Sequence, residues 1–385
     1  MDANTFKSLG IDAKRVANVA TSIKADVDSE LCDGGVVIVS RNGTVVLHEA
    51  VGMTDKDKGR ATKKDDVFCI MSLTKSMVAT LLLCCVERGE FRLTSAVADV
   101  IPEFGQMGKH RTTIAQVLGH MGGLPSSPIL PLDQWGNMEK IVSSLCQSAP
   151  AATPGENISY SSFAAGYIAG ELIRRVDHRG RSLRQIMKDD LFQPLGMKDT
   201  SLGQREDLEQ RRVRIVFRDK NEGRHSPETI EKMNTVFCEG SEVPSAGCYS
   251  TAEDYHKFAM MLLSGGEYGG VRFLSPLTIN LATSIFTGNL PNLAFFLYRE
   301  TRDWSPSPAN LGLGFYVRGE GIFNTYFGTL NSPRAFGHPG LGSTWFWVDP
   351  VHKMAFVALT AGLMEESRSM QRFQRLSDIA LSSII

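Results

Sequence analysis

The residues best suited to chemistry lie in the stretch from Met71 to Met77, which reads Met-Ser-Leu-Thr-Lys-Ser-Met. Apolar residues at helical spacing follow as far as Gly89, so the sequence predicts a helix that begins near Ser72. Lys75 then lies one turn away on the same face. A lysine can take the proton of a serine hydroxyl if burial or nearby positive charge lowers its pKa. Backbone N–H groups at a helix start can also stabilise an oxyanion. Ser72 and Lys75 are therefore the candidate nucleophile and base.

Two later stretches carry further polar side chains next to predicted elements. The first, Ile158-Ser159-Tyr160-Ser161-Ser162, precedes an apolar helical run over 163–173. The second, from Phe336 to Gly342, contains His338 and precedes a strand-like run over 344–348. A tyrosine has a free pKa of ~10 and needs a nearby cation to act as a base near neutral pH, and Lys75 could supply that charge. Whether Lys75 or Tyr160 is the base stays open, because the two protons are coupled.

In this order and at these separations, the S-x-x-K, Y-x-S and H-x-G patterns resemble those of the penicillin-recognising serine hydrolases. This superfamily includes class C β-lactamases, DD-peptidases, family VIII carboxylesterases and fungal acyltransferases of the lovastatin type. The resemblance runs from about Gly34 to about Ala361. Four further segments match the superfamily's landmarks: Gln116 to Pro125, Pro154 to Glu156, Leu191 to Met197, and Ala246 to Asp254.

The resemblance implies a role for each candidate residue. Tyr160 would be the general acid/base, and the backbone N–H of Leu341 would join that of Ser72 in an oxyanion hole. Gly340 would let the substrate lie close to the strand, and His338 occupies the position of a lysine in β-lactamases.

Two further side chains are candidates for substrate binding. Ser162 takes the place of the superfamily's usual Asn or Ser and would orient Lys75 or the substrate. Trp345, on one predicted strand face with Trp347, would either line an acyl pocket or pack in the core. The aromatic-rich segment 289–308 suits a bulky, weakly charged group.

The predicted elements form an α/β (α+β) fold that would position these residues. Helices are expected over 1–30 and 367–385, a hairpin around Asn42-Gly43, and strands over 312–318, 335–336, 344–348 and 354–359. The run 211–218 alternates like a strand but could be an extended connector. The resemblance implies the same layout, a β-lactamase/transpeptidase-like antiparallel sheet flanked by helices. The chain 1–385 would be one catalytic unit, with an α/β subdomain of residues 1–95 and 240–385 and a helical subdomain of residues 96–239.

Composition argues against several classes of function. The chain has 385 residues, 41 basic and 42 acidic, and no basic block that would indicate a nucleic-acid partner. Its apolar stretches are far shorter than the ~20 residues of a membrane helix, and the first residues lack the apolar core of a secretion signal, so we expect a cytoplasmic protein without a membrane partner. The seven cysteines show no C-x-x-C spacing and are expected to be free thiols. No metal or cofactor motif occurs, so we expect neither.

These observations predict a serine hydrolase or acyltransferase that forms an acyl-enzyme on Ser72. The substrate would be a small ester or thioester, for example a natural product of secondary metabolism. The partners would be a small-molecule acyl donor and either water or an alcohol or amine acceptor. Two alternatives remain. One is an enzyme that uses Tyr160 and Lys75 for proton transfer, as in dehydration or C–C cleavage. The other is a non-catalytic binding protein on the same fold.

Overall fold

The central sheet starts from the hairpin that Asn42 and Gly43 close. Strand β1 (Gly34–Arg41) pairs with β2 (Thr44–Asp55) in antiparallel register. Asn42 and Gly43 have φ of 49° and 80°, the left-handed values that a two-residue hairpin turn requires. All of β1 except Arg41 is buried, because elements cover both faces of this strand. The sequence therefore predicted this hairpin.

In this computed structural model, which describes residues 2–127, 129–219, 226–288, 290, 302–342 and 344–385, the sheet has seven strands in the order β3-β2-β1-β12-β11-β10-β9. Neighbouring strands are antiparallel throughout. The remaining members are β3 (Arg60–Ala61), β9 (Tyr316–Val317), β10 (Phe336–Gly340), β11 (Thr344–Asp349) and β12 (Met354–Ala361). A second sheet has the order β4-β6-β5, formed by Phe68–Cys69, Cys248–Ser250 and Ser201–Leu202. Strands β7 (Glu267–Tyr268) and β8 (Val271–Arg272) form a separate hairpin.

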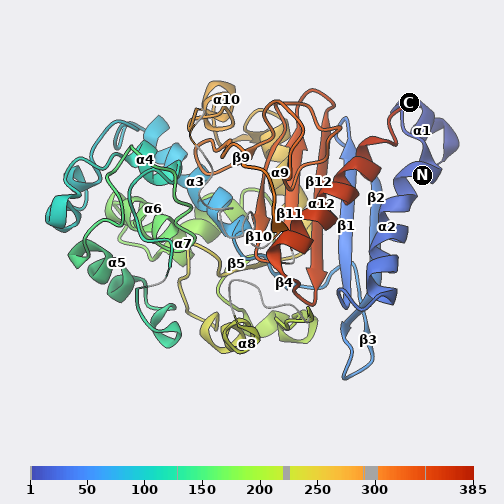
Figure 1. Cartoon of the computed structure of the whole chain (residues 1–385), viewed down its shortest axis with the longest axis horizontal. Helices are drawn as coiled ribbons and strands as arrows, with labels where there is room; N and C mark the ends of the chain where they lie inside the picture. The colour runs from blue at the N-terminus through green and yellow to red at the C-terminus, as the bar shows by residue number, and fades with distance from the viewer. Residues whose placement is uncertain (1, 128, 220–225, 289, 291–301, 343) are drawn as a thin grey trace.

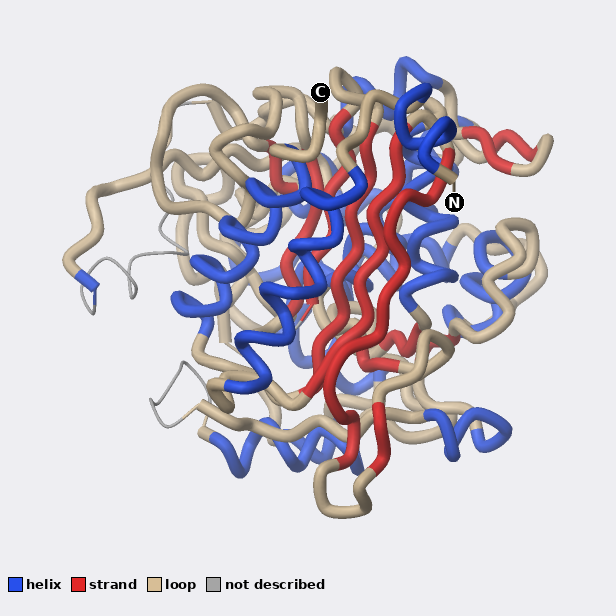
Figure 2. The backbone as a smooth tube through the Cα atoms, turned by 90° about the vertical axis from the view of Figure 1, so that its right-hand side faces the viewer, coloured by secondary structure: helices blue, strands red, loops and turns tan. Residues whose placement is uncertain are grey.

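Each face of the large sheet has its own apolar core, because successive side chains of a strand point to opposite faces. Val36 and Phe346 belong to the core beneath α3 (Leu73–Glu87) and α9 (Ala252–Leu263). Val37 and Trp345 belong to the core beneath α2 (Ala13–Asp28) and α12 (Glu366–Leu381). Figure 2 shows helices lying along the strands of the sheet. The result is a layer of strands between two layers of helices.

The middle of the chain is mostly helical and lies to one side of the large sheet (Figure 1). Its helices are α4 (Ile114–Leu118), α5 (Met138–Gln147), α6 (Ala164–Arg175), α7 (Leu183–Met187) and α8 (Pro227–Val236). A short helix, α10 (Pro276–Ala282), follows α9. Among the described residues, no helix combines the length and the apolar character that crossing a membrane would need.

One sequence expectation needs correction in detail, and one open alternative is decided. The N-terminal helix is divided into α1 (Ala3–Ser8) and α2, because Gly10 adopts a left-handed φ of 62° between them. The run 211–218 forms only isolated bridges, of Arg212 with Val67 and of Phe217 with Leu363. It is an extended connector, because its two ends pair with different segments. The seven cysteines are free thiols, as expected.

Candidate active site

Ser72 stands at the start of α3, where the backbone makes a sharp turn. The preceding Met71 has a φ of 51°, a left-handed value that is costly for a residue with a side chain. Thr74 holds this turn, since its hydroxyl donates to the Met71 carbonyl oxygen at 2.7 Å. A serine at a helix N-cap usually accepts a bond from a helix N–H, but the Ser72 side chain makes no such bond. Its hydroxyl instead accepts a hydrogen bond from Lys75.

Lys75 is held against Ser72 from inside the protein. Its side chain is buried, with 5% of the residue exposed, and Nζ lies 2.9 Å from the Ser72 Oγ. Nζ also donates to the Ser245 carbonyl oxygen at 2.6 Å. The close approach of Ser245 depends on Gly166 in α6, where a Cβ would lie 2.8 Å from the Ser245 Cα. The structure thus brings the predicted nucleophile and base into hydrogen-bond contact.

Tyr160 reaches the same point from the segment before α6. The Lys75 Nζ lies 5.5 Å from the centroid of the Tyr160 ring. The ring of His120 packs against the Tyr160 ring at a centroid distance of 4.5 Å. The two residues flanking Tyr160 also contact His120: the Ser159 N–H donates to its carbonyl oxygen at 3.1 Å, and the Ser161 hydroxyl lies 3.2 Å from its Nδ1. His120 therefore holds Tyr160 through one ring contact with Tyr160 itself and two hydrogen-bond contacts with its neighbours.

His338 lies next to Tyr160 and Tyr316. It is 1% exposed, and its ring packs 5.3 Å from that of Tyr316 and 6.2 Å from that of Tyr160. Its Nδ1 lies 2.8 Å from the Pro339 carbonyl oxygen, which only accepts, so Nδ1 carries the proton. Burial lowers the pKa of His338 well below its ordinary value, and the Lys75 ammonium lowers it further. The same two causes bring the pKa of His120 to about 3. Both imidazoles are neutral at physiological pH.

The end of strand β10 lies against the residues that precede Ser72. A Cβ on Gly340 would lie 2.7 Å from the Ile70 carbonyl oxygen and 3.1 Å from the Met71 Cβ. The Thr344 hydroxyl donates to the same Ile70 oxygen at 2.9 Å and ties β11 to this point. Only a glycine fits there, because the Ile70 backbone approaches this position closely. The turn that starts at Leu341 therefore follows directly after the contact between β10 and the start of α3.

For Ser162 and Trp345 the structure shows contacts that the sequence left open, and it bears out core packing, one of the two alternatives given for Trp345. The Ser162 hydroxyl donates to the Ser126 carbonyl oxygen at 2.7 Å and so fastens a loop. Trp345 is fully buried between β11 and α12, with its ring 5.0 Å from that of Phe327 and its Nε1 3.4 Å from the Ser377 Oγ. A side chain without accessible surface cannot line a substrate pocket, so Trp345 is a core residue. Phe295, Phe296 and Tyr298 of the aromatic segment lie outside the described residues.

Sequence reasoning overlooked three contributors to the site. His120 lies inside a matched landmark segment but was not among the candidate residues, Ser245 carried no motif, and Tyr316 lies in a two-residue strand. For His120 the only signal was its place between Gly119 and Gly122 in a loop. Ser245 and Tyr316 reach the site through tertiary contacts with Lys75 and His338. Within the described residues, no cluster of three or more side chains could hold a metal ion.

Comparison with known proteins shows the family and the fold of the chain. The family model described as Beta-lactamase matches residues 19–379. The chain belongs to the beta-lactamase family. A curated relative, the esterase/beta-lactamase LipL of Mycobacterium tuberculosis, is 25% identical over 84% of this chain and 76% of its own length.

Two solved structures share the fold over nearly their whole length. A penicillin-binding protein homologue from Caulobacter crescentus superposes with a TM-score of 0.79 at 24% identity, covering 96% of this chain and 97% of its own. EstCE1, described as a hydrolase with promiscuous acyltransferase activity, gives 0.77 at 20% identity, with coverages of 98% and 100%. The fold is therefore β-lactamase-like, and its family is one of hydrolases.

Proposed function

We propose that the protein is a serine esterase or acyltransferase that forms an acyl-enzyme on Ser72. The observation that carries the proposal is the 2.9 Å hydrogen bond between the Lys75 Nζ and the Ser72 Oγ, with the Tyr160 ring beside the same Nζ. A nucleophile that contacts a candidate base, which a third group orients in turn, is the arrangement of covalent acyl transfer.

In the first half-reaction the Ser72 Oγ attacks the ester carbonyl carbon while its proton passes to the Lys75–Tyr160 pair. The N–H groups of Ser72 and Leu341 would stabilise the oxyanion that forms. Collapse of this intermediate breaks the bond to the alcohol, which leaves with the proton that the pair holds. The product is an ester on Ser72.

In the second half-reaction an acceptor takes the acyl group. Water, or an alcohol or amine, gives a proton to the same pair as it attacks the acyl carbon. The bond to the Ser72 Oγ breaks, and Oγ recovers a proton from the pair. Hydrolysis and acyl transfer differ only in the acceptor. The curated relative named as an esterase/beta-lactamase and the solved hydrolase with acyltransferase activity support both outcomes.

Covalent labelling with a fluorophosphonate tests the proposal, because this probe reacts with activated serines. Intact mass should show one adduct on the wild-type protein and none on Ser72→Ala. Ser143→Ala removes an exposed hydroxyl from α5 and should label as the wild type does. An unlabelled wild type would favour proton-transfer chemistry or a binding protein, and labelling that persists in Ser72→Ala would place the nucleophile elsewhere.

A further inference from the structure

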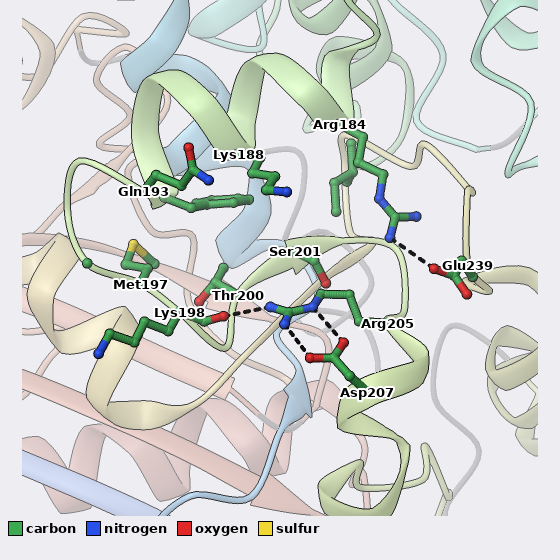
Figure 3. Close-up of a pocket in the computed structure, with 13 residues that line it drawn as sticks. Arg184, Lys188, Gln193, Met197, Lys198, Thr200, Ser201, Arg205, Asp207 and Glu239 are labelled. Carbon is green, nitrogen blue, oxygen red and sulfur yellow. Dashed lines mark hydrogen bonds and ion pairs between the residues drawn. The ribbon is translucent and has the colours of Figure 1, made fainter.

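A hollow with a volume of about 550 Å³ lies apart from the Ser72 cluster. Arg184 and Lys188 border it from α7 and the π-helical turn Lys188–Phe192 that follows. Ser201 of β5 borders it from the opposite side (Figure 3), and Leu202 of the same strand also lines it. In the small sheet, β6 separates β5 from β4, and β4 leads to Ser72. The hollow is therefore distinct from the candidate catalytic site.

The charges that line this hollow are mostly positive. Four basic side chains and two acidic ones contribute: Arg184, Lys188, Lys198, Arg205, Asp207 and Glu239. Each acid already has a basic partner, because Asp207 accepts from Arg205 at 2.5 and 3.0 Å, and a Glu239 carboxylate oxygen lies 3.8 Å from Arg184. Pairing thus leaves the two lysines uncompensated in this lining.

Lys188 and Lys198 differ in direction. Figure 3 shows the Lys188 side chain beside Arg184 above the hollow, whereas Lys198 extends away beyond Met197. The acids nearest to Lys188 in the sequence, Asp189 and Asp190, bind Arg181 at 3.1 and 2.7 Å. Among the described residues, no carboxylate lies within ion-pair distance of Lys188. Its ammonium therefore faces the hollow with its charge available.

The guanidinium groups nearby keep donors for a ligand. Arg184 spends one nitrogen, Nη2, on the Gln204 carbonyl oxygen at 3.0 Å and the distant Glu239. A guanidinium carries five N–H donors in a planar fork that matches phosphate oxygens. Buried apolar side chains also line the hollow, namely Phe192, Met197 and Leu202. An occupant should therefore combine a multiply charged anionic group with an apolar body.

We propose that this hollow is a second binding site that takes a small organic phosphate monoester. The phosphate would contact Lys188 and Arg184, and its organic part would lie against Phe192 and Met197. A dianion fits better than a single carboxylate, because a lysine and an arginine line the same hollow. Binding here involves no covalent step and does not depend on Ser72.

Isothermal titration with phenyl phosphate tests the site, in the wild type and in Ser72→Ala. Both proteins should bind it saturably, phenol should not bind, and inorganic phosphate should bind more weakly. Lys188→Glu should weaken binding at least about tenfold, the effect of losing one charge-assisted bond. Lys198→Glu makes the same charge change on a side chain that points away and should alter the affinity less than threefold, since exposed charges interact weakly. Thermal melting verifies that Lys188→Glu and Lys198→Glu are both folded.

Three results would overturn the proposal. Equal losses in Lys188→Glu and Lys198→Glu would indicate diffuse surface charge instead of a site. Equal affinity for inorganic phosphate and phenyl phosphate would remove the apolar part of the proposed ligand. If phenyl phosphate showed no saturable binding up to about 10 mM, the binding free energy would be weaker than about −3 kcal/mol, and the site would be excluded.

Discussion

At the scale of single residues, the site is a series of side-chain contacts that begins at the hydroxyl of Ser72. Lys75 touches Ser72 through a hydrogen bond and lies beside the ring of Tyr160, and His120 holds Tyr160 in place. Both imidazoles of the cluster are neutral, because burial and the Lys75 charge disfavour protonation. Lowered pKa values make both imidazoles weak bases, so the proposed mechanism assigns the proton exchange to Lys75 and Tyr160.

Removing either member of the pair should cost activity, and removing both should cost little more. We expect Lys75→Ala and Tyr160→Phe each to lower kcat by about 10²- to 10⁴-fold on an aryl ester. The kcat of the double variant should be far higher than the value obtained by multiplying the two single losses, since the effects of groups that act as one unit are not additive. Steady-state kinetics of the four proteins measures this, and multiplicative losses would assign separate roles to the two residues.

His120 should act as a positioning residue for Tyr160. His120→Asn keeps a residue type that tolerates the left-handed φ of 57°, but it removes the ring beneath Tyr160. We expect kcat to fall about tenfold or more, because small misplacements of a catalytic group are costly. KM and thermal melting should change little. Ser161→Ala removes one of the three contacts and serves as the milder comparison.

A result at full kcat for His120→Asn would show that Tyr160 is held without the imidazole. A parallel fall in melting temperature and activity would reduce His120 to a structural role. The pH–rate profile separates these cases, since a displaced Tyr160 shifts the profile and a loss of folded protein does not.

At the scale of elements, the contact between β10 and α3 decides where the two proposed oxyanion donors meet. Gly340 permits that contact, and Thr344 fastens it to Ile70. Gly340→Ala would introduce a Cβ 1.9 Å from the Thr344 Oγ1, so the strand must shift away from Ser72. We expect a loss of about 1–3 kcal/mol in the free energy of unfolding and a fall in kcat with it.

Urea unfolding and aryl-ester kinetics on the same preparation measure both effects of Gly340→Ala. Gly340→Ala is also made in a Thr344→Ala protein, which lacks the hydroxyl that the new Cβ would clash with. Wild-type kcat in Gly340→Ala would mean that the strand end can move without disturbing the site.

His256 joins α9 to β1 and makes stability depend on pH. Its Nε2 lies 2.8 Å from the Ser40 Oγ, and burial, aided by His48, lowers its pKa to about 4 from 6.5. A lowered folded pKa means that the unfolded chain binds this proton more readily, so the folded state loses stability as pH falls from 6.5 toward 4. Above 6.5 this group contributes no pH dependence.

His256→Gln should flatten the fall in the free energy of unfolding between pH 6.5 and 4. The wild type should lose up to about 1.4 kcal/mol per pH unit more than the variant over this window. Urea unfolding at pH 7, 5.5 and 4.5 measures the difference. Parallel curves for the two proteins would mean that His256 gains its proton equally in both states.

At the scale of the whole molecule, the strand of the large sheet that lies against the start of α3 carries the residues expected to select the substrate. His338 and Pro339 stand where the superfamily resemblance places a lysine and a threonine that hold the carboxylate of an antibiotic. The buried His338 is neutral, and proline offers neither hydroxyl nor N–H. Recognition of an anionic substrate should therefore be weak on this strand.

We accordingly expect short aryl esters to be turned over and cephalosporins to be poor substrates. The measurement is a parallel assay of p-nitrophenyl butyrate and a chromogenic cephalosporin, with kcat/KM for each. Ser72→Ala gives the background rate for both. A much higher kcat/KM for the cephalosporin would place the protein among the β-lactamases proper.

The sequence by itself determined the local features. Asn42-Gly43 predicted its hairpin because few residues adopt a left-handed φ, and apolar residues at helical spacing predicted the helix that begins near Ser72. The order of Ser72, Lys75, Tyr160 and His338 identified the superfamily. These signals are short-range, so a linear reading detects them.

Only the tertiary structure decided which side chains meet. Trp345 and Thr344 are neighbours on β11, yet the first lies in the core under α12 and the second holds Ile70 beside Ser72, because strand neighbours point to opposite faces. Ser245 reaches Lys75 across 170 positions of sequence. Contacts of this kind depend on how helices and strands pack, and burial then fixes the charge of His120 and His338. No local pattern encodes either outcome.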